Sequence, residues 1–203
     1  MNNEHKIKKI FLVVVVLFLL FLGTVLVKQN LAIEGAYLYN DFKVQPVSNG
    51  KITTYRVEFI HNGNPYYLNS RNPPNLVDNI SVIGNVKDYV LSKEKIFVGI
   101  NPFDPELRGL TALAGLSIDG FIESFFGIPV FSSFTEFDSK HPDIPVLTCD
   151  KTKDGLIILE LANDTSVSLK NNCILVHGGN EIDIIRAVDR LNFELIGIIR
   201  PPK

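Results

Sequence analysis

Two cysteines are the residues of this 203-residue chain whose type and placement point most directly to chemistry. Cys149 ends one apolar segment and Cys173 begins another. An oxidising compartment would let the two thiols form a disulfide. Closing a loop of about 25 residues would add roughly 3.5 kcal/mol to stability in the chain-entropy model. The alternative is two separate buried thiols that pack as small hydrophobic side chains.

Two histidines extend these cysteines toward catalysis or metal binding. His141 or His177 would be the base beside a nucleophilic Cys149, or both would join the cysteines as zinc ligands. The chain has no Cys-x-x-Cys pair, and these four residues match no compact zinc-site spacing. The sequence therefore predicts no metal site and no catalytic residue, and ordinary turn and strand-end histidines are expected.

A Gly178-Gly179 turn lies between a predicted strand and a predicted helix, where free backbone amides attract anions. Glu181 and Asp183 already place negative charge in the first turn of that helix, and no dinucleotide or P-loop pattern accompanies the glycines. We therefore expect no phosphate-containing cofactor here. The two glycines are expected to provide a tight connection with positive φ.

Two pairs of acids resemble the carboxylate pairs of hydrolases. Asp104 and Glu106 are better explained by capping of a helix N-terminus, and Asp119 and Glu123 stand four residues apart on one exposed helix face. Neither pair requires catalysis. Asn79 and Asn163 each begin an Asn-x-Ser/Thr tripeptide and are candidate glycosylation sites if they face outward.

The elements that must position these residues begin with an N-terminal apolar run. Residues 10–27 contain no charge and would span roughly 27 Å as a helix, close to the thickness of a bilayer. The basic residues before the run place the tail, residues 1–9, in the cytoplasm. We expect a retained, single-pass signal-anchor in contact with lipid, with the C-terminal part outside the cell. A cleaved signal peptide is the alternative.

After a juxtamembrane linker over residues 28–50, the pattern becomes that of a folded domain, residues 51–203. Tyr55, Val57 and Phe59 alternate with polar residues as in a half-covered strand. The turn residues 61–65 then predict a hairpin with residues 66–68. Residues 86–91 are expected to form one or two helical turns.

A strand, helix, strand unit follows, with an apolar strand over residues 95–100. Asp104 as the N-cap and Pro105 as the first helical residue predict the start of the helix, and Gly127 predicts its end. Residues 128–131 are the expected second strand, and the length of the unit suits a parallel crossover.

The remaining elements are four short strands and a last helix. Strands are expected at 144–149, 156–161, 167–169 and 173–176, the last three as an antiparallel meander. Asn180 is the predicted cap of a helix with an apolar stripe from Ile182 to Leu195. The fold class is therefore α/β, with an N-terminal transmembrane helix and one small mixed-sheet domain with packed helices.

The charge of the outer part limits its partners. Residues 29–203 carry 16 basic and 21 acidic residues, a net of −5, because four of the 20 basic residues and one of the 22 acidic residues precede them. Binding to nucleic acid needs a basic face, so it is not expected.

Several segments together carry a family resemblance: KIFVGINP at 95–102, IPVLTCD at 144–150, NCILVHGG at 172–179 and IRAVDRL at 185–191. In their order and type, these segments resemble a group of uncharacterised single-pass membrane proteins of small-genome archaea. The resemblance covers about residues 75–199. It implies an archaeal source, a surface location and a paired role for Cys149 and Cys173, and it implies no activity.

The sequence thus favours a non-enzymatic, membrane-anchored protein of the cell envelope whose outer domain interacts with a partner or has a structural role. The alternative is an extracytoplasmic hydrolase or thiol-dependent enzyme with Cys149 as the residue to test.

Overall fold

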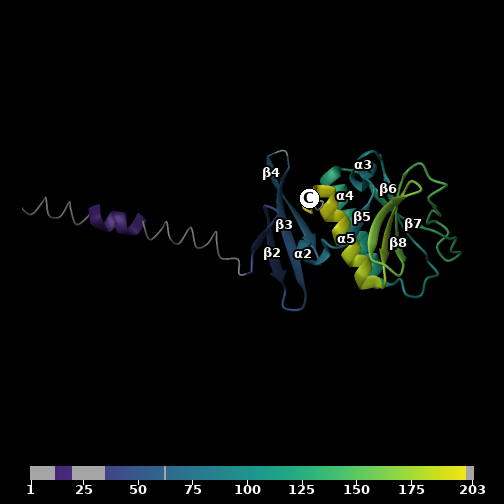
Figure 1. Ribbon diagram of the computed structural model, residues 1–203, viewed down its shortest axis with the longest axis horizontal. Coiled ribbons are helices and arrows are strands. Elements are labelled where there is room, and N and C mark those ends of the chain that lie inside the picture. Colours follow the sequence, from purple (N-terminus) through teal and green to yellow (C-terminus); the bar gives the residue numbers. More distant parts are fainter. Residues whose placement is uncertain (1–11, 20–34, 62, 200–203) are drawn as a thin grey trace, which may run out of the picture. The chain divides into compact units, whose positions relative to one another are not determined.

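A computed structural model describes residues 12–19, 35–61 and 63–199. The chain divides into two compact units, residues 1–37 and 38–203. Residues 12–19 are helical (Figure 1), and their side chains are exposed. The rest of the predicted span 10–27 and the tail 1–9 lie outside the described residues. The membrane anchor and its orientation therefore stay predictions.

The first part of the larger unit is an antiparallel sheet in the order β1-β2-β3-β4. Its strands are β1 (Tyr37–Tyr39), β2 (Phe42–Ser48), β3 (Thr53–His61) and β4 (Asn64–Ser70). The predicted hairpin is β3–β4, and Gly63 in its turn has a φ of 78°. The prediction of an irregular linker over 28–50 was wrong for β1 and β2. Polar and apolar residues alternate too weakly in β2 for the sequence alone to predict a strand. The strand forms through its pairing with β3.

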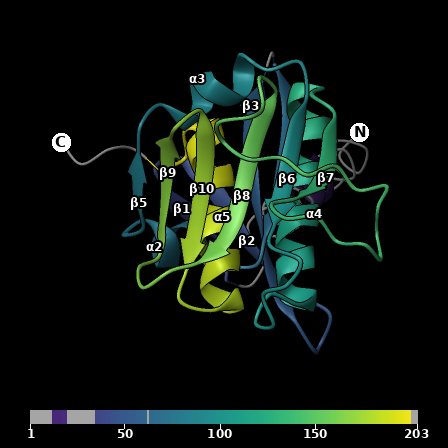
Figure 2. The ribbon, with the colours of Figure 1, turned by 90° about the vertical axis from the view of Figure 1, so that its right-hand side faces the viewer.

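The second sheet has six strands in the order β5-β9-β10-β8-β6-β7 (Figure 2). They are β5 (Ser81–Ile83), β6 (Ile96–Ile100), β7 (Val130–Phe134), β8 (Gly155–Leu161), β9 (Ser166–Lys170) and β10 (Cys173–Gly178). The strands β10, β8, β6 and β7 are parallel to one another, whereas β9 is antiparallel to β10. The α/β class with a mixed sheet is confirmed.

The predicted antiparallel meander was only half right. β9 and β10 form a hairpin through Asn171 and Asn172, both with positive φ. β10, however, lies between β9 and β8 and is parallel to β8. Short apolar strands are alike in sequence, so their order depends on how the whole sheet packs.

Four helices accompany the sheets: α2 (Pro74–Val77), α3 (Val86–Leu91), α4 (Gly109–Phe126) and α5 (Glu181–Ile196). In Figure 1, α4 and α5 lie between the two sheets. Figure 2 shows α5 behind β10 and β8, and α4 behind β6 and β7. The Phe125 ring of α4 packs at 5.0 Å from the Phe59 ring and 5.3 Å from the Tyr66 ring of the antiparallel sheet, between centroids. These aromatic contacts join the first sheet to the helical layer.

The strand, helix, strand unit is present as β6, α4 and a parallel β7, and Gly127 ends the helix with a φ of 68° as predicted. The predicted start was wrong. Asp104 accepts a hydrogen bond from the Glu106 N–H in a local turn, and α4 begins only at Gly109. An Asp-Pro pair favours a tight turn as well as a helix start, and here the turn forms.

The strands predicted at 128–131 and 144–149 needed correction, whereas the predicted helix cap Asn180 was confirmed. β7 begins at Val130 instead of residue 128. Residues 144–149 form a loop that touches β7 through the single bridge of Val146 with Phe134. Asn180 caps α5 by accepting hydrogen bonds from the Ile182 and Asp183 N–H groups.

Among the described residues, α4 is the one helix long and apolar enough to cross a membrane by length and composition. Its place between the two sheets accounts for that apolar composition (Figure 1).

Candidate functional site

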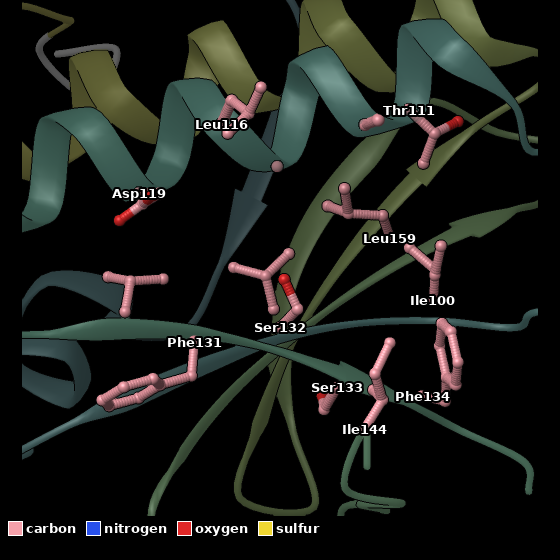
Figure 3. Close-up of a pocket in the computed structure, with 14 residues that line it drawn as sticks. Ile100, Thr111, Leu116, Asp119, Phe131, Ser132, Ser133, Phe134, Ile144 and Leu159 are labelled. Atoms are coloured by element: carbon pink, nitrogen blue, oxygen red, sulfur yellow. The ribbon is translucent and has the colours of Figure 1, made fainter. Parts of the chain in front are cut away.

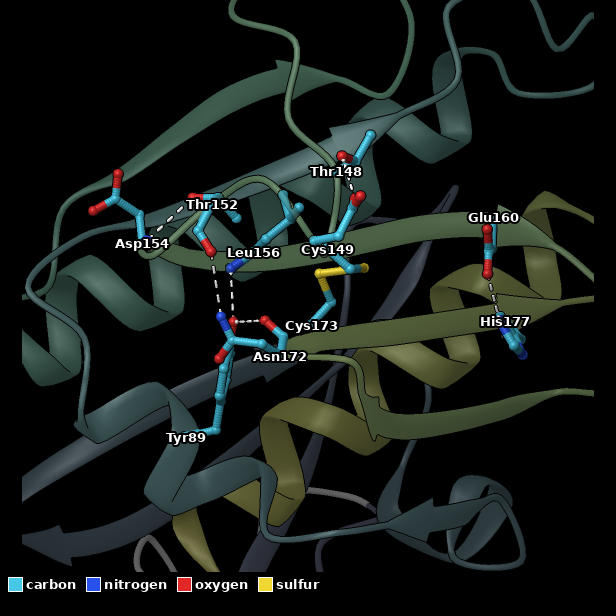
Figure 4. The surroundings of a disulfide bond; sticks show 11 residues. Tyr89, Thr148, Cys149, Thr152, Asp154, Leu156, Glu160, Asn172, Cys173 and His177 are labelled. Carbon is cyan, nitrogen blue, oxygen red and sulfur yellow. Dashed lines mark hydrogen bonds and ion pairs between the residues drawn. A yellow bond between two sulfur atoms is a disulfide. The ribbon is translucent and has the colours of Figure 1, made fainter.

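Cys149 and Cys173 are joined in a disulfide, with 5.3 Å between their Cα atoms (Figure 4). Cys173 packs with Leu156 and Ile158 on the sheet face opposite the two long helices, and Leu147 from the loop adds to this cluster. The bond therefore fastens the loop before β8 onto the sheet. Because both sulfurs are bonded, neither is a free thiolate in this structure, and the hypothesis of a thiol-dependent enzyme with Cys149 stays a prediction.

The two histidines are separated from the cysteines and from each other. The His141 Nδ1 lies 2.6 Å from an Asp138 carboxylate oxygen. Hydrogen bonds, first from the Lys140 N–H and then from His141, lower the pKa of Asp138. His177 instead contacts Glu160, so the four side chains of the zinc hypothesis do not meet. Nowhere in the described part of the chain do three His, Cys, Asp or Glu side chains converge as metal ligands.

A line of polar side chains crosses three neighbouring strands at His177. Its Nε2 lies 2.7 Å from the Glu160 Oε1, and its Nδ1 lies 3.4 Å from the Ser166 Oγ. The sheet register places His177 opposite both residues. Alternation in the sequence puts each side chain on a strand face, but only the strand order brings the three together.

This line has the groups of a nucleophilic triad in the right order, a hydroxyl, an imidazole and a carboxylate. The Ser166 hydroxyl, however, donates to the Asp164 Oδ2 at 2.7 Å, and Ser166 is only 6% exposed. The proton of Ser166 is thus directed away from the imidazole, and the hydroxyl is poorly accessible.

The Gly178-Gly179 turn allows close packing of α5 against the sheet. Neither glycine has positive φ, so the expected reason for them was wrong. A Cβ atom on Gly178 would overlap the backbone nitrogen of Ile184, and the glycine lets α5 approach the end of β10. This close approach depends on tertiary packing, which the local pattern does not reveal.

Glu181 supplies the N-terminal cap that α4 lacks in its own sequence. Its Oε1 accepts hydrogen bonds from the Arg108 N–H at 2.6 Å and from the Thr111 N–H and hydroxyl at 2.9 Å. Burial opposes ionisation, but the hydrogen bonds from Thr111 and Arg108 outweigh it and lower the pKa of Glu181. The positive end of α4 is therefore already neutralised by a carboxylate.

Asp189 on α5 is the most deeply buried acid of the domain, at 2% exposure. Its Oδ2 accepts hydrogen bonds from the Asn72 N–H at 2.8 Å and the Asn72 side-chain amide at 2.9 Å. Burial raises the pKa of Asp189 to about 6 even so, because these hydrogen bonds only partly offset desolvation. Asp189 ties the chain after β4 to α5 and has a structural role.

An apolar pocket of about 350 Å³ lies between α4 and β7, and we call it the α4–β7 pocket (Figure 3). Val98, Ile100 and Leu159 line it from the sheet, and Ala112, Gly115 and Leu116 line it from the helix. Small side chains on this face of α4 leave the space open.

Asp119 is the one acidic or basic side chain that lines this pocket among the described residues. Figure 3 shows its carboxylate extending from α4 toward β7, with the Ser132 hydroxyl on the opposite wall. The Asp119 Oδ1 is buried and has no hydrogen-bond partner. The predicted sharing of an exposed face with Glu123 was wrong, because Asp119 is half-buried while Glu123 is exposed.

An unpartnered buried carboxylate oxygen is costly in a folded protein and calls for an explanation. No basic residue lines the α4–β7 pocket, so its acid is not neutralised by the pocket itself. The pocket can therefore accept an apolar group that ends in a cation or a strong hydrogen-bond donor. Sequence reasoning missed it because the pocket needs β7 and α4 side by side.

The two candidate glycosylation residues, Asn79 and Asn163, are both exposed. Their side chains are accessible to a modifying enzyme, and occupancy stays a prediction.

Comparisons of the chain with models of protein families, with curated proteins and with solved structures find no match.

Proposed function

We propose that this chain is a membrane-anchored extracytoplasmic protein whose α/β domain binds a partner in the cell envelope through the α4–β7 pocket. The observation that carries the proposal is the unpartnered Asp119 carboxylate in an otherwise apolar pocket. A purely structural domain gains nothing from a buried acceptor without a donor, whereas a binding site uses it for specificity.

The location rests on two further supports. The Cys149–Cys173 disulfide fits an oxidising compartment. The uncharged run 10–27 has the length of a transmembrane helix, and its described residues 12–19 expose apolar side chains that lipid would cover.

Site-specific photo-crosslinking in the membranes of the source cells tests the binding role. A benzoylphenylalanine at Leu116, which is 63% exposed beside the pocket, is expected to give a discrete crosslinked product. The same group at the exposed Lys51 is the matched control and should give none. Crosslinking at Leu116 should also fall in an Asp119→Asn background. Equal products from both positions, or none from Leu116, would contradict the proposal.

The topology is tested separately by cysteine labelling on intact cells. A membrane-impermeant maleimide should label a Ser139→Cys variant, whose exposed position lies in the loop before β8. It should label an Asn2→Cys variant only after lysis. The reverse pattern would place the domain in the cytoplasm and remove the location from the proposal.

A second candidate function, an extracytoplasmic hydrolase, is favoured by one observation, the line from Ser166 through His177 to Glu160. A fluorophosphonate probe labels activated serines. Labelling of the wild-type chain that disappears in Ser166→Ala and His177→Ala would support this function. An unlabelled wild-type chain would leave the line as a structural hydrogen-bond network.

A further inference from the structure

β7 forms one edge of the six-stranded sheet, and only its C-terminal end is covered there. The Phe134 N–H donates to the Pro145 carbonyl at 2.9 Å, and the Phe134 carbonyl accepts from the Leu147 N–H at 2.9 Å. Both polar backbone groups of Phe134 therefore face the outer edge, away from β6.

Along a strand, the N–H and carbonyl groups of successive residues point alternately to its two edges, so those of residues two apart point to the same edge. The N–H and carbonyl groups of Val130 and Ser132 must then face the same outer edge as those of Phe134. Among the described residues, none forms a backbone hydrogen bond to Val130 or Ser132 on that edge. Half of this edge strand is thus available for pairing.

The loop that pairs with Phe134 does not extend this pairing to Ser132. The Ile144 N–H bonds to the His141 carbonyl at 3.2 Å, which closes a local turn, and Pro145 has no N–H to offer. A seventh strand is therefore started at Val146 but not completed: Ile144 and Pro145 line a pocket with Ser132, yet among the described residues no backbone hydrogen bond reaches Val130 or Ser132 on this edge.

A pocket lies on each face of this edge. The α4–β7 pocket is on the helix side, and a second pocket of about 390 Å³, which we call the outer pocket, is lined by Phe97, Phe131 and Ile144 with the charged Lys95 and Asp143 at its border. Ser132 lines both. A strand added to β7 would point successive side chains alternately into the two pockets, as in binding by strand addition.

The acidic group in the α4–β7 pocket favours one kind of side chain from the partner. The Asp119 Oδ1 has no partner in the described part of the chain, and the Thr111 hydroxyl, another polar group of α4 that lines the pocket, is already bonded to Glu181. A lysine or arginine side chain matches this pocket, because its aliphatic stem can lie along the apolar lining while its charge meets Asp119.

We propose that the open edge of β7 binds an extended segment of a partner protein, with a basic side chain in the α4–β7 pocket and apolar neighbours in the outer pocket. This inference rests on the proposed binding function and adds the chemistry of the partner. Strand addition supplies affinity through the main chain, and Asp119 supplies specificity.

The test uses the full chain in detergent and a capped peptide, acetyl-Thr-Val-Lys-Val-Thr-amide, with binding followed by calorimetry. Replacement of the lysine by norleucine is expected to weaken binding about 10-fold or more, since it removes a charge-assisted hydrogen bond. Asp119→Asn should weaken the lysine peptide to the same degree and leave the norleucine peptide unchanged. Equal losses for both peptides would overturn the assignment of Asp119.

The backbone part of the inference has its own variants. Ser132→Pro removes an outward N–H and should abolish binding, whereas Ser132→Ala keeps this group and should bind far more tightly than Ser132→Pro. An N-methylated lysine peptide tests the same contact on unmutated protein. Tight binding of butylamine alone, with no gain from the peptide, would show a small-molecule site and overturn strand addition.

The two proposals can fail separately. Absence of peptide binding at millimolar concentration, together with a persistent crosslink at Leu116, would overturn the strand-addition inference and leave the binding function standing. Absence of both the peptide binding and the crosslink at Leu116 would overturn the strand-addition inference and the proposed binding function together.

Discussion

The two long helices of the middle layer, α4 and α5, differ in how they are held. α5 begins with its own cap, Asn180, and buries ten of its 16 residues. α4 has no cap of its own and depends on Glu181 of α5 at its first turn. It also exposes Leu113 and Leu116 and borders the α4–β7 pocket.

This difference separates a structural helix from one available for binding. α5 has an apolar stripe and a polar face, so the core covers most of its hydrophobic side chains, and Ile182 in the first turn is the exposed exception. α4 is apolar on most sides, and the two sheets cover only part of it. Exposed leucines beside a pocket that contains an unpartnered acid are typical of an interaction site.

The largest expected contrast comes from truncating one leucine on each helix. Leu191→Ala on α5 removes a side chain with 0% exposure and should cost about 2–5 kcal/mol of unfolding free energy. Leu116→Ala on α4, a side chain with 63% exposure, should change it by no more than about 0.5 kcal/mol. Urea denaturation measures both. Similar costs would show that α4 is as structural as α5.

The next effect is the pH dependence caused by Asp189 on α5. Its pKa is about 6 in the folded state against an ordinary 3.8, so the folded state binds this proton more tightly. Between these values, lowering the pH should stabilise the domain, by about 3 kcal/mol in full, and raising the pH should remove this stabilisation.

Denaturation of the wild type and of Asp189→Asn between pH 4 and 7 isolates this contribution. The variant should lose the fall in stability with rising pH, because its amide does not ionise. An unchanged pH profile would assign the dependence to another group.

The caps give a smaller contrast. Glu181→Gln should cost about 1 kcal/mol, because a neutral amide oxygen replaces the carboxylate that caps α4. Asn180→Ala should cost a similar amount through α5. Hydrogen exchange should distinguish them, with faster exchange in the first turn of α4 for Glu181→Gln. Exchange that increases only in α5 would contradict the shared cap.

The smallest expected effect is that of Asp119→Leu on stability. Removing a buried oxygen without a partner should leave the melting temperature unchanged or raise it, by an amount equivalent to less than about 1 kcal/mol. The same variant should lose peptide binding. A clear loss of stability would make Asp119 a structural residue and weaken the binding interpretation of α4.

The success of sequence reasoning follows the same division between the helices. α5, its cap Asn180 and its end were predictable because a local cap and an apolar stripe define it. The start of α4 was not, because its cap comes from Glu181, 70 residues away from Thr111. β2 was missed for a related reason, since its pairing with β3 and not its own pattern forms the strand.

The candidate site shows this limit most clearly. Asp119 was recognised as an acid on a helix, but the burial of its unpartnered Oδ1 depends on where β7 lies. Ser166 was not singled out at all, since its contact with His177 exists only because β9 is the neighbour of β10.

The sequence by itself determined the α/β class, the hairpin of β3 and β4, the end of α4 at Gly127 and the whole of α5, because caps, turns and apolar periodicity act over a few residues. Only the tertiary structure decided the order of the six strands, the shared cap Glu181, the close approach at Gly178 and the pocket beside Asp119. These features depend on contacts between segments far apart in the chain, and a local pattern carries no information about which segments will meet.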